Sequence, residues 1–212
     1  MLTGTLVGAA ESTDAPPEAA WRAARDGLGG LVSAALADQP ERYGFPADVA
    51  VEELRLDTPW RQYALPPDAV LNVAPSLSSI EETLQATDTW LFPIVRGDSP
   101  CALLAVNYSG EEWRAAALGY VGLSRELARV RAQWPAKGGY HARLVSSFQA
   151  RRHLFTVPEA GAPNLTLLRT SPAPTQSIFD YRRLDAPAAT LQTLQAEVQA
   201  NLHAFPAGGP AP

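Results

Sequence analysis

Three segments of the chain carry apolar residues at the spacing that forms one face of a helix. They span about residues 16–38, 123–134 and 187–202. Pro135 ends the second segment, because proline cannot continue a helix. Gly27, Gly29 and Gly30 interrupt the first segment, and each glycine costs a helix about 1 kcal/mol relative to alanine. We therefore expect this helix either to break at the glycines or to let another element approach closely.

Apolar runs of strand length, separated by turn residues, occupy much of the remaining chain. The runs span 54–56, 60–65, 90–96, 101–108, 112–118, 142–148, 153–157 and 165–170. Residues 97–100 and 109–110 contain glycine, proline and serine, which favour tight turns, so the strands of 90–118 are predicted to form an antiparallel meander. Ser78 and Ser79 each precede a glutamate by three positions, which predicts a short helix that runs to about Gln85.

The order of these elements predicts an α+β fold, in which a mostly antiparallel sheet of hairpins and meanders is flanked by three main helices. Strands and helices do not alternate, so a doubly wound or barrel α/β enzyme is not expected. We expect a single domain over residues 1–205, with possible sub-blocks at 50–134 and 140–204. Residues 206–212 are rich in proline, glycine and alanine, which predicts a disordered tail.

Composition restricts the class of protein further. The chain has 212 residues, of which 46% are hydrophobic, and it includes five tryptophans, as is typical of a folded globular protein. The single cysteine, Cys101, excludes an internal disulfide and a cysteine-rich zinc site. No stretch approaches the roughly 18 consecutive apolar residues that a transmembrane helix requires, so no membrane span is predicted.

The first ten residues allow two interpretations. Leu2 and Leu6, with their threonine neighbours, suit a first strand, whereas Val7-Gly8-Ala9 ends in the small residues typical of a trimmed export signal. Low charge, high proline content and one lysine against sixteen arginines are typical of an exported protein. We therefore expect an extracytoplasmic location in preference to a cytoplasmic one.

Common phosphate- and metal-binding motifs are missing from the sequence. Neither the glycine-rich dinucleotide motif nor the phosphate loop occurs, and the three histidines lack the spacing of a zinc site. We therefore expect no metal and no cofactor. A hydrolase or transferase site remains open, with Cys101 or Ser124 as nucleophile and His141 or His153 as base. Cys101 begins an apolar strand, however, where a free cysteine behaves as a small hydrophobic residue.

Charge is unevenly distributed along the chain. Residues 1–100 carry a net charge of −9 and residues 101–212 carry +4, which gives −5 for the whole chain. Residues 125–152 contain seven basic residues and one acidic residue, with aromatic residues among them. Arginine beside aromatic rings is a composition that suits anionic ligands. The candidate binding residues are Arg125, Arg129, Arg143, Arg151, Arg152, Tyr140 and His141.

These observations favour a non-enzymatic binding or interaction module of the bacterial accessory type, which holds an anionic ligand or partner on its arginine-rich surface. The partner is expected to be a protein or an anionic small molecule, because an isoelectric point near 5.2 argues against a dedicated nucleic-acid binder. Two alternatives stay open. One is the hydrolase or transferase described above, and the other is a small-molecule-sensing sheet domain whose pocket is lined by Trp60, Trp90 and Trp113.

Overall fold

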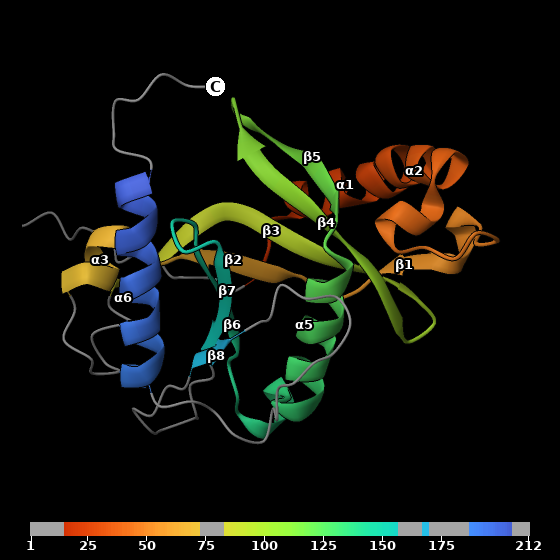
Figure 1. Ribbon diagram of the computed structural model, residues 1–212. Coiled ribbons are helices and arrows are strands. Elements are labelled where there is room, and N and C mark those ends of the chain that lie inside the picture. The colour runs from red at the N-terminus through yellow and green to blue at the C-terminus, as the bar shows by residue number, and fades with distance from the viewer. Residues whose placement is uncertain (1–14, 73–82, 157–166, 170–186, 205–212) are drawn as a thin grey trace, which may run out of the picture.

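A computed structural model describes residues 15–72, 83–156, 167–169 and 187–204. The described strands form one sheet of eight strands (Figure 1). They are β1 (Leu54–Leu56), β2 (Trp60–Ala64), β3 (Gln85–Arg96), β4 (Ser99–Ser109), β5 (Glu112–Gly119), β6 (Arg143–Ser147), β7 (Arg152–Thr156) and β8 (Leu167–Arg169). Their order across the sheet is β5-β4-β3-β2-β6-β7-β8, and β1 pairs with β3.

Strands β3, β4 and β5 form an antiparallel meander, which confirms the prediction for residues 90–118. Gly97 and Gly110 lie in its two turns with φ angles of 58° and 60°, a conformation that glycine adopts without steric cost. The meander is longer than the apolar pattern indicates, because β3 begins at Gln85. The first residues of β3 pair with β2, where Gln85 lies opposite Ala64.

A parallel strand pair joins this meander to the rest of the sheet. Strands β6, β7 and β8 are antiparallel neighbours, but β6 lies beside β2 rather than beside β5. Strands β2 and β6 run parallel, with Gln62 opposite Leu144. The chain therefore crosses one face of the sheet after β5, and α5 (Val121–Gln133) makes this crossing. As a result, strands from both predicted sub-blocks belong to one sheet.

Helices cover both faces of the sheet. Besides α5, they are α1 (Glu18–Gly27), a π-helical turn (Leu28–Val32), α2 (Ser33–Asp38), α3 (Pro67–Asn72) and α6 (Pro187–Ala204). Figure 1 shows α1 and α2 toward one end of the sheet and α6 beside α3 toward the other. The architecture is therefore α+β, with a mostly antiparallel sheet and three main helical segments, as the order of elements predicts.

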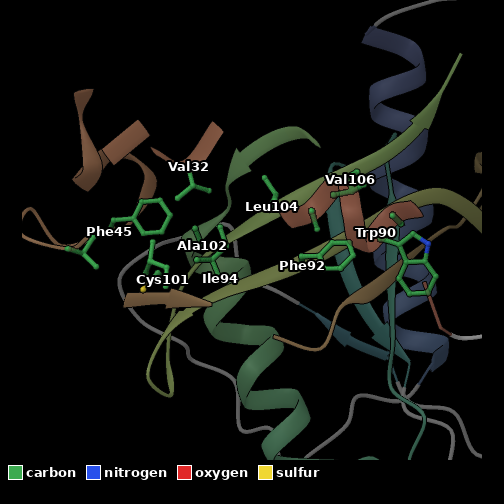
Figure 2. Packing of buried hydrophobic residues seen from close by; sticks show 14 residues of the cluster. Val32, Phe45, Trp90, Phe92, Ile94, Cys101, Ala102, Leu104 and Val106 are labelled. Atoms are coloured by element: carbon green, nitrogen blue, oxygen red, sulfur yellow. The ribbon is translucent and has the colours of Figure 1, made fainter. Parts of the chain in front are cut away.

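Alternate residues of β3 contribute to hydrophobic clusters on opposite faces of the sheet. Trp90, Phe92 and Ile94 pack on the face that α1 covers, next to residues of β4 and to Phe45 (Figure 2). Leu91 lies on the other face, where the buried side of α5 packs. This alternation places the α1 cluster and the α5 cluster back to back across the sheet.

A third cluster lies on the same face as α1, beneath α3 and α6. It contains Val145 of β6 and Leu154 of β7 together with Leu194 and Val198 of α6. Hydrogen bonds from the side chains of α6 fix the helix at this position, because Gln195 donates to the Val70 carbonyl and Asn201 donates to the Gln149 carbonyl. The last helix is therefore attached to the sheet by both apolar packing and polar contacts.

The glycines of the first helical segment account for both of its unusual features. A Cβ atom at Gly27 would lie 2.5 Å from the Cβ of Ala115 on β5, so only glycine allows this close approach. Immediately after Gly27 the α-helix changes to the π-helical turn, in which Gly29 and Gly30 face open space. The expected close approach and the expected interruption are thus both present, at different glycines.

Three expectations concern residues outside the described ranges. They are the strand or export signal at residues 1–10, the capping boxes at 78–82 and the tail at 206–212. Within the described ranges, no helix has both the length and the apolar character needed to cross a membrane. The same part of the chain contains no group of three or more histidine, cysteine, aspartate or glutamate side chains arranged to hold a metal ion.

Candidate anion-binding pocket

A pocket of about 190 Å3 lies where β2 and β6 begin. Its walls come from the connection before β2, from β2 itself, from the end of α5 and from the connection into β6. The lining residues are Thr58, Pro59, Trp60, Arg61, Tyr63, Arg131, Trp134, Ala136, Tyr140, His141, Ala142 and Arg143. The pocket therefore exists only because the parallel pairing brings these four segments together.

A tight turn after α5 positions two aromatic side chains of the pocket. Pro135 follows the last helical residues, and Gly139 has a φ of 83°, so the chain turns back toward the sheet, as Figure 1 shows between α5 and β6. A Cβ atom at Gly138 would lie 3.2 Å from the Tyr140 ring, so glycine leaves room for that ring. Tyr140 then packs edge-on against Trp134, with ring centroids 4.9 Å apart.

Arg131 and Trp60 form a second wall. The guanidinium of Arg131 lies 4.7 Å from the centroid of the Trp60 ring, within range for a cation–π interaction. The nearest carboxylate oxygen of Asp57 is 3.8 Å from Arg131 Nη1. Burial lowers the pKa of Arg131, against the opposing effect of Asp57. The guanidinium stays charged, and it has lost part of its hydration while forming only a long ion pair with Asp57.

Arg61 and Arg143 approach the pocket from the opposite face of the sheet. Both guanidinium groups lie over the ring of Tyr63, at 6.0 Å and 5.5 Å from its centroid. Arg61 also lies 5.7 Å from the centroid of Trp90. These aromatic contacts hold two further positive charges beside the pocket.

The lining is positively charged. It contains three arginines and His141 but neither an aspartate nor a glutamate. Trp60 and Arg131 also line a second cavity of about 260 Å3, and Asp57 and Asp98 lie in that cavity. The stacked pair of Trp60 and Arg131 therefore separates a cationic pocket from a cavity that contains carboxylates.

Buried hydrogen-bond donors occur among the lining residues. The indole nitrogens of Trp60 and Trp134 and the Nε of Arg61 have no hydrogen-bond partner in the part of the chain that the structure describes. Buried donors in folded proteins nearly always have an acceptor, and leaving one unpaired costs about 1–3 kcal/mol. The pocket lining thus contains unpaired donors, from which an anion can accept hydrogen bonds.

The pocket contains three of the seven residues predicted to bind a ligand, namely Tyr140, His141 and Arg143. The other four lie outside its lining. Arg125 and Arg129 are exposed on α5, where Arg129 contacts Glu126 at 2.9 Å. Arg151 is exposed in the turn between β6 and β7. Arg152 forms an ion pair with Glu197 of α6.

The residues of the hydrolase hypothesis make other contacts. Ser124 Oγ donates to the carbonyl of Ala102, and Cys101 contacts the carbonyl of Ser99 within the hydrophobic cluster of Figure 2. His153 Nδ1 is 3.0 Å from the Oγ of a different serine, Ser146, which is only 1% exposed. Burial lowers the pKa of His153 and so favours the neutral ring.

A hydrogen-bond chain connects three strands at this histidine. Gln62 of β2 donates to Ser146 of β6 at 2.7 Å, and Ser146 faces His153 of β7 across a register pair. When His153 is neutral, the hydroxyl of Ser146 can donate to Nδ1, which places the ring proton on Nε2. The pair resembles a nucleophile and its base in composition, but the buried hydroxyl leaves no route for a substrate to this oxygen. Its geometry is that of a structural link across the sheet.

The tryptophans of the sensing hypothesis are distributed over the molecule. Trp60 lines the pocket, whereas Trp90 is buried in the cluster beneath α1. Trp113 lies on β5 and lines a different groove beside α1. The second tryptophan that lines the pocket is Trp134, which the sensing hypothesis did not include.

Two arginines of the pocket were not among the sequence candidates. Arg61 lies in the acidic first half of the chain, so the charge distribution pointed away from it. Arg131 belongs to the basic segment, and its position one residue after Val130 turns it toward the flank of α5 that meets Trp60. In the sequence, each of these arginines lies near a tryptophan at the start of a strand or the end of a helix. This pattern identifies a binding residue only when the neighbours of the strand in the sheet are known.

Comparison with protein-family models, with curated proteins and with solved structures gives no match for this chain.

Proposed function

We propose that the protein is a non-enzymatic binding module that takes a small anionic molecule into the pocket at the beginning of β2 and β6. The observation that carries this proposal is that Arg61, Arg131 and Arg143 all line one pocket whose lining contains no carboxylate. Tyr140 and His141 complete the polar part of the lining. A concave site with apolar walls and a few convergent polar groups is the usual form of a small-molecule site.

The distribution of charge favours a small-molecule ligand over a protein partner that binds across a broad surface. Arg129 and Arg152, which belong to the basic segment, already contact Glu126 and Glu197. Three further arginines, Arg61, Arg131 and Arg143, line the pocket. Guanidinium groups there are partly removed from water, so their attraction for an anion is screened less than it would be on an open surface.

Nuclear magnetic resonance can test this proposal, because Trp60 and Trp134 each provide an indole N–H signal at the pocket. The probes are acetate, benzoate and inorganic phosphate, with chloride at equal ionic strength as the control. We expect at least one probe to shift these two indole signals in a saturable manner, with the signals assigned through Trp60→Phe and Trp134→Phe. An absence of shifts for all three probes at millimolar concentration would overturn the proposal.

A pair of arginine variants on the same helix shows whether the pocket is responsible. Arg131→Gln removes a lining charge, and we expect the affinity to fall about tenfold or more, since a hydrogen bond to a charged group contributes about 1.5–3 kcal/mol. Arg125→Gln changes an exposed residue of α5 outside the lining and should leave the affinity unchanged. Equal losses in both variants would mean that general surface charge, rather than the pocket, attracts the anion.

A further inference from the structure

The volume of the pocket restricts the size of its ligand. At about 190 Å3 it is smaller than the roughly 300–1,000 Å3 of sites that take drug-sized molecules. A protein cavity of about 150 Å3 is known to accept benzene. The part of a ligand that lies inside the pocket is therefore limited to about one six-membered ring and one further small group.

The shapes of the lining groups restrict the ligand further. The indole of Trp134 and the phenol ring of Tyr140 are flat, and they meet edge-on at 4.9 Å. The guanidinium of Arg131 is also flat and is stacked on the ring of Trp60. An aromatic ligand ring can make edge-on or offset contacts with these side chains that a saturated ring does not make, so the lining favours an aromatic ligand.

The charged groups and the volume of the pocket together restrict the kind of anion. A guanidinium presents parallel N–H groups whose spacing matches two oxygens of a carboxylate or of a phosphate. A carboxylate attached to an aromatic ring lies close to the plane of that ring, whereas a phosphate is tetrahedral and larger. A pocket with room for a single ring and one small group therefore fits the smaller carboxylate better.

We propose that the ligand is a single-ring aromatic carboxylate, with its carboxylate toward the arginines and its ring against Trp134 and Tyr140. This inference rests on the proposed anion-binding function and names the class of ligand for the same pocket. The aromatic contacts account for selectivity, and the arginines account for the requirement of a negative charge.

Calorimetric titration of the unaltered protein with four probes tests the inference. Benzoate is the expected ligand, acetate lacks the ring, cyclohexanecarboxylate has a puckered ring with the same charge, and phenyl phosphate has the ring with a tetrahedral anion. We expect benzoate to bind about three- to tenfold more tightly than each of the other probes, the range that aromatic pairing provides. Equal affinity for cyclohexanecarboxylate, or tighter binding of phenyl phosphate, would overturn the inference and leave the proposed function intact.

Two variants assign the selectivity to the aromatic wall. Trp134→Leu should lower the affinity for benzoate more than the affinity for acetate and so reduce the advantage of benzoate, and Tyr140→Leu should reduce the same advantage. An unchanged benzoate-to-acetate ratio in both folded variants would contradict the assignment of the ring site. Failure of all four probes to bind would instead contradict the proposed function itself. The comparison of probes on the unaltered protein remains decisive even if a variant does not fold.

Discussion

Arg152 of β7 donates two hydrogen bonds to Glu197 of α6, from Nε to Oε2 at 3.1 Å and from Nη2 to Oε1 at 2.8 Å. Both side chains are about one-quarter exposed, at 23% and 24%. Glu197 also raises the pKa of Arg152, mainly through these hydrogen bonds. This bidentate ion pair connects the last helix to the sheet. Arg152, one of the candidate ligand-binding arginines, therefore forms an internal contact instead.

The ion pair of Arg152 and Glu197 should contribute measurably to stability. A double-mutant cycle with Arg152→Met and Glu197→Gln is expected to give a coupling of about 1 kcal/mol, toward the upper end for pairs that water still reaches. The measurement is urea unfolding. The pair of Arg25 and Glu18, whose side chains are 56% and 72% exposed, is the internal control. Its coupling should be smaller, and a larger value there would contradict the argument from exposure.

The stacking of Arg131 on Trp60 should depend on the planar shape of the guanidinium. Arg131→Lys keeps the charge but loses the flat group, so we expect the free energy of unfolding to fall by about 0.5–1 kcal/mol. Arg125→Lys, six positions earlier on the same helix, changes an exposed residue and should cost less. Chemical denaturation of both variants checks the difference, and equal losses would count against a specific contribution from the stack.

Gly27 should resist substitution because of the close approach to β5. Gly27→Ala places a methyl group against Ala115, and overpacking of this kind costs about 1–3 kcal/mol, more than the roughly 1 kcal/mol that alanine gains in helix propensity. We therefore expect a net loss of stability. Gly29→Ala meets no atom within 4 Å and should be neutral or stabilising. Adding Ala115→Gly to Gly27→Ala should recover part of the loss, and thermal unfolding without such recovery would contradict the steric explanation.

His153 should make the stability of the protein depend on pH. Burial lowers its pKa in the folded state below the ordinary value of 6.5, so the unfolded chain binds more protons over the interval between the two values. Stability from this group is present above about pH 6.5 and is lost as the pH falls through that interval toward the folded-state pKa. Urea unfolding at pH 7.5 and pH 5.5 (roughly one unit either side of the ordinary value) should show a smaller decrease for His153→Gln than for the unaltered protein. An identical decrease would exclude His153 as the source.

Periodicity predicted most of the individual elements, because it reflects contacts that recur within each element. The apolar stripe of residues 123–134 became α5, and the runs between 90 and 118 became adjacent antiparallel strands because short turns leave them few other partners. The end of α5 near Pro135 follows from local chemistry in the same way.

The parallel pairing of β2 and β6 could not be predicted in this manner. Gln62 and Leu144 are paired although 82 positions separate them, and a local sequence pattern carries no information about pairing over such a distance. The pocket depends on this pairing, so only its segment between α5 and β6 was visible as a basic and aromatic stretch. Tyr140, His141 and Arg143 were therefore identified, whereas Arg61 on the other strand was not.

The parallel pairing of β2 and β6 means that a ligand in the pocket should also stabilise strands that it does not contact. A ligand in the pocket contacts both β2 and β6. If β6, β7 and β8 separate from β2 in a local opening, these contacts are lost, so the ligand must dissociate before the opening can occur. Backbone amides on β7 should therefore exchange with deuterium more slowly as the ligand concentration rises, although β7 contributes no residue to the lining. Ligand binding would thus reduce the local opening of β7, a strand that contributes no residue to the pocket.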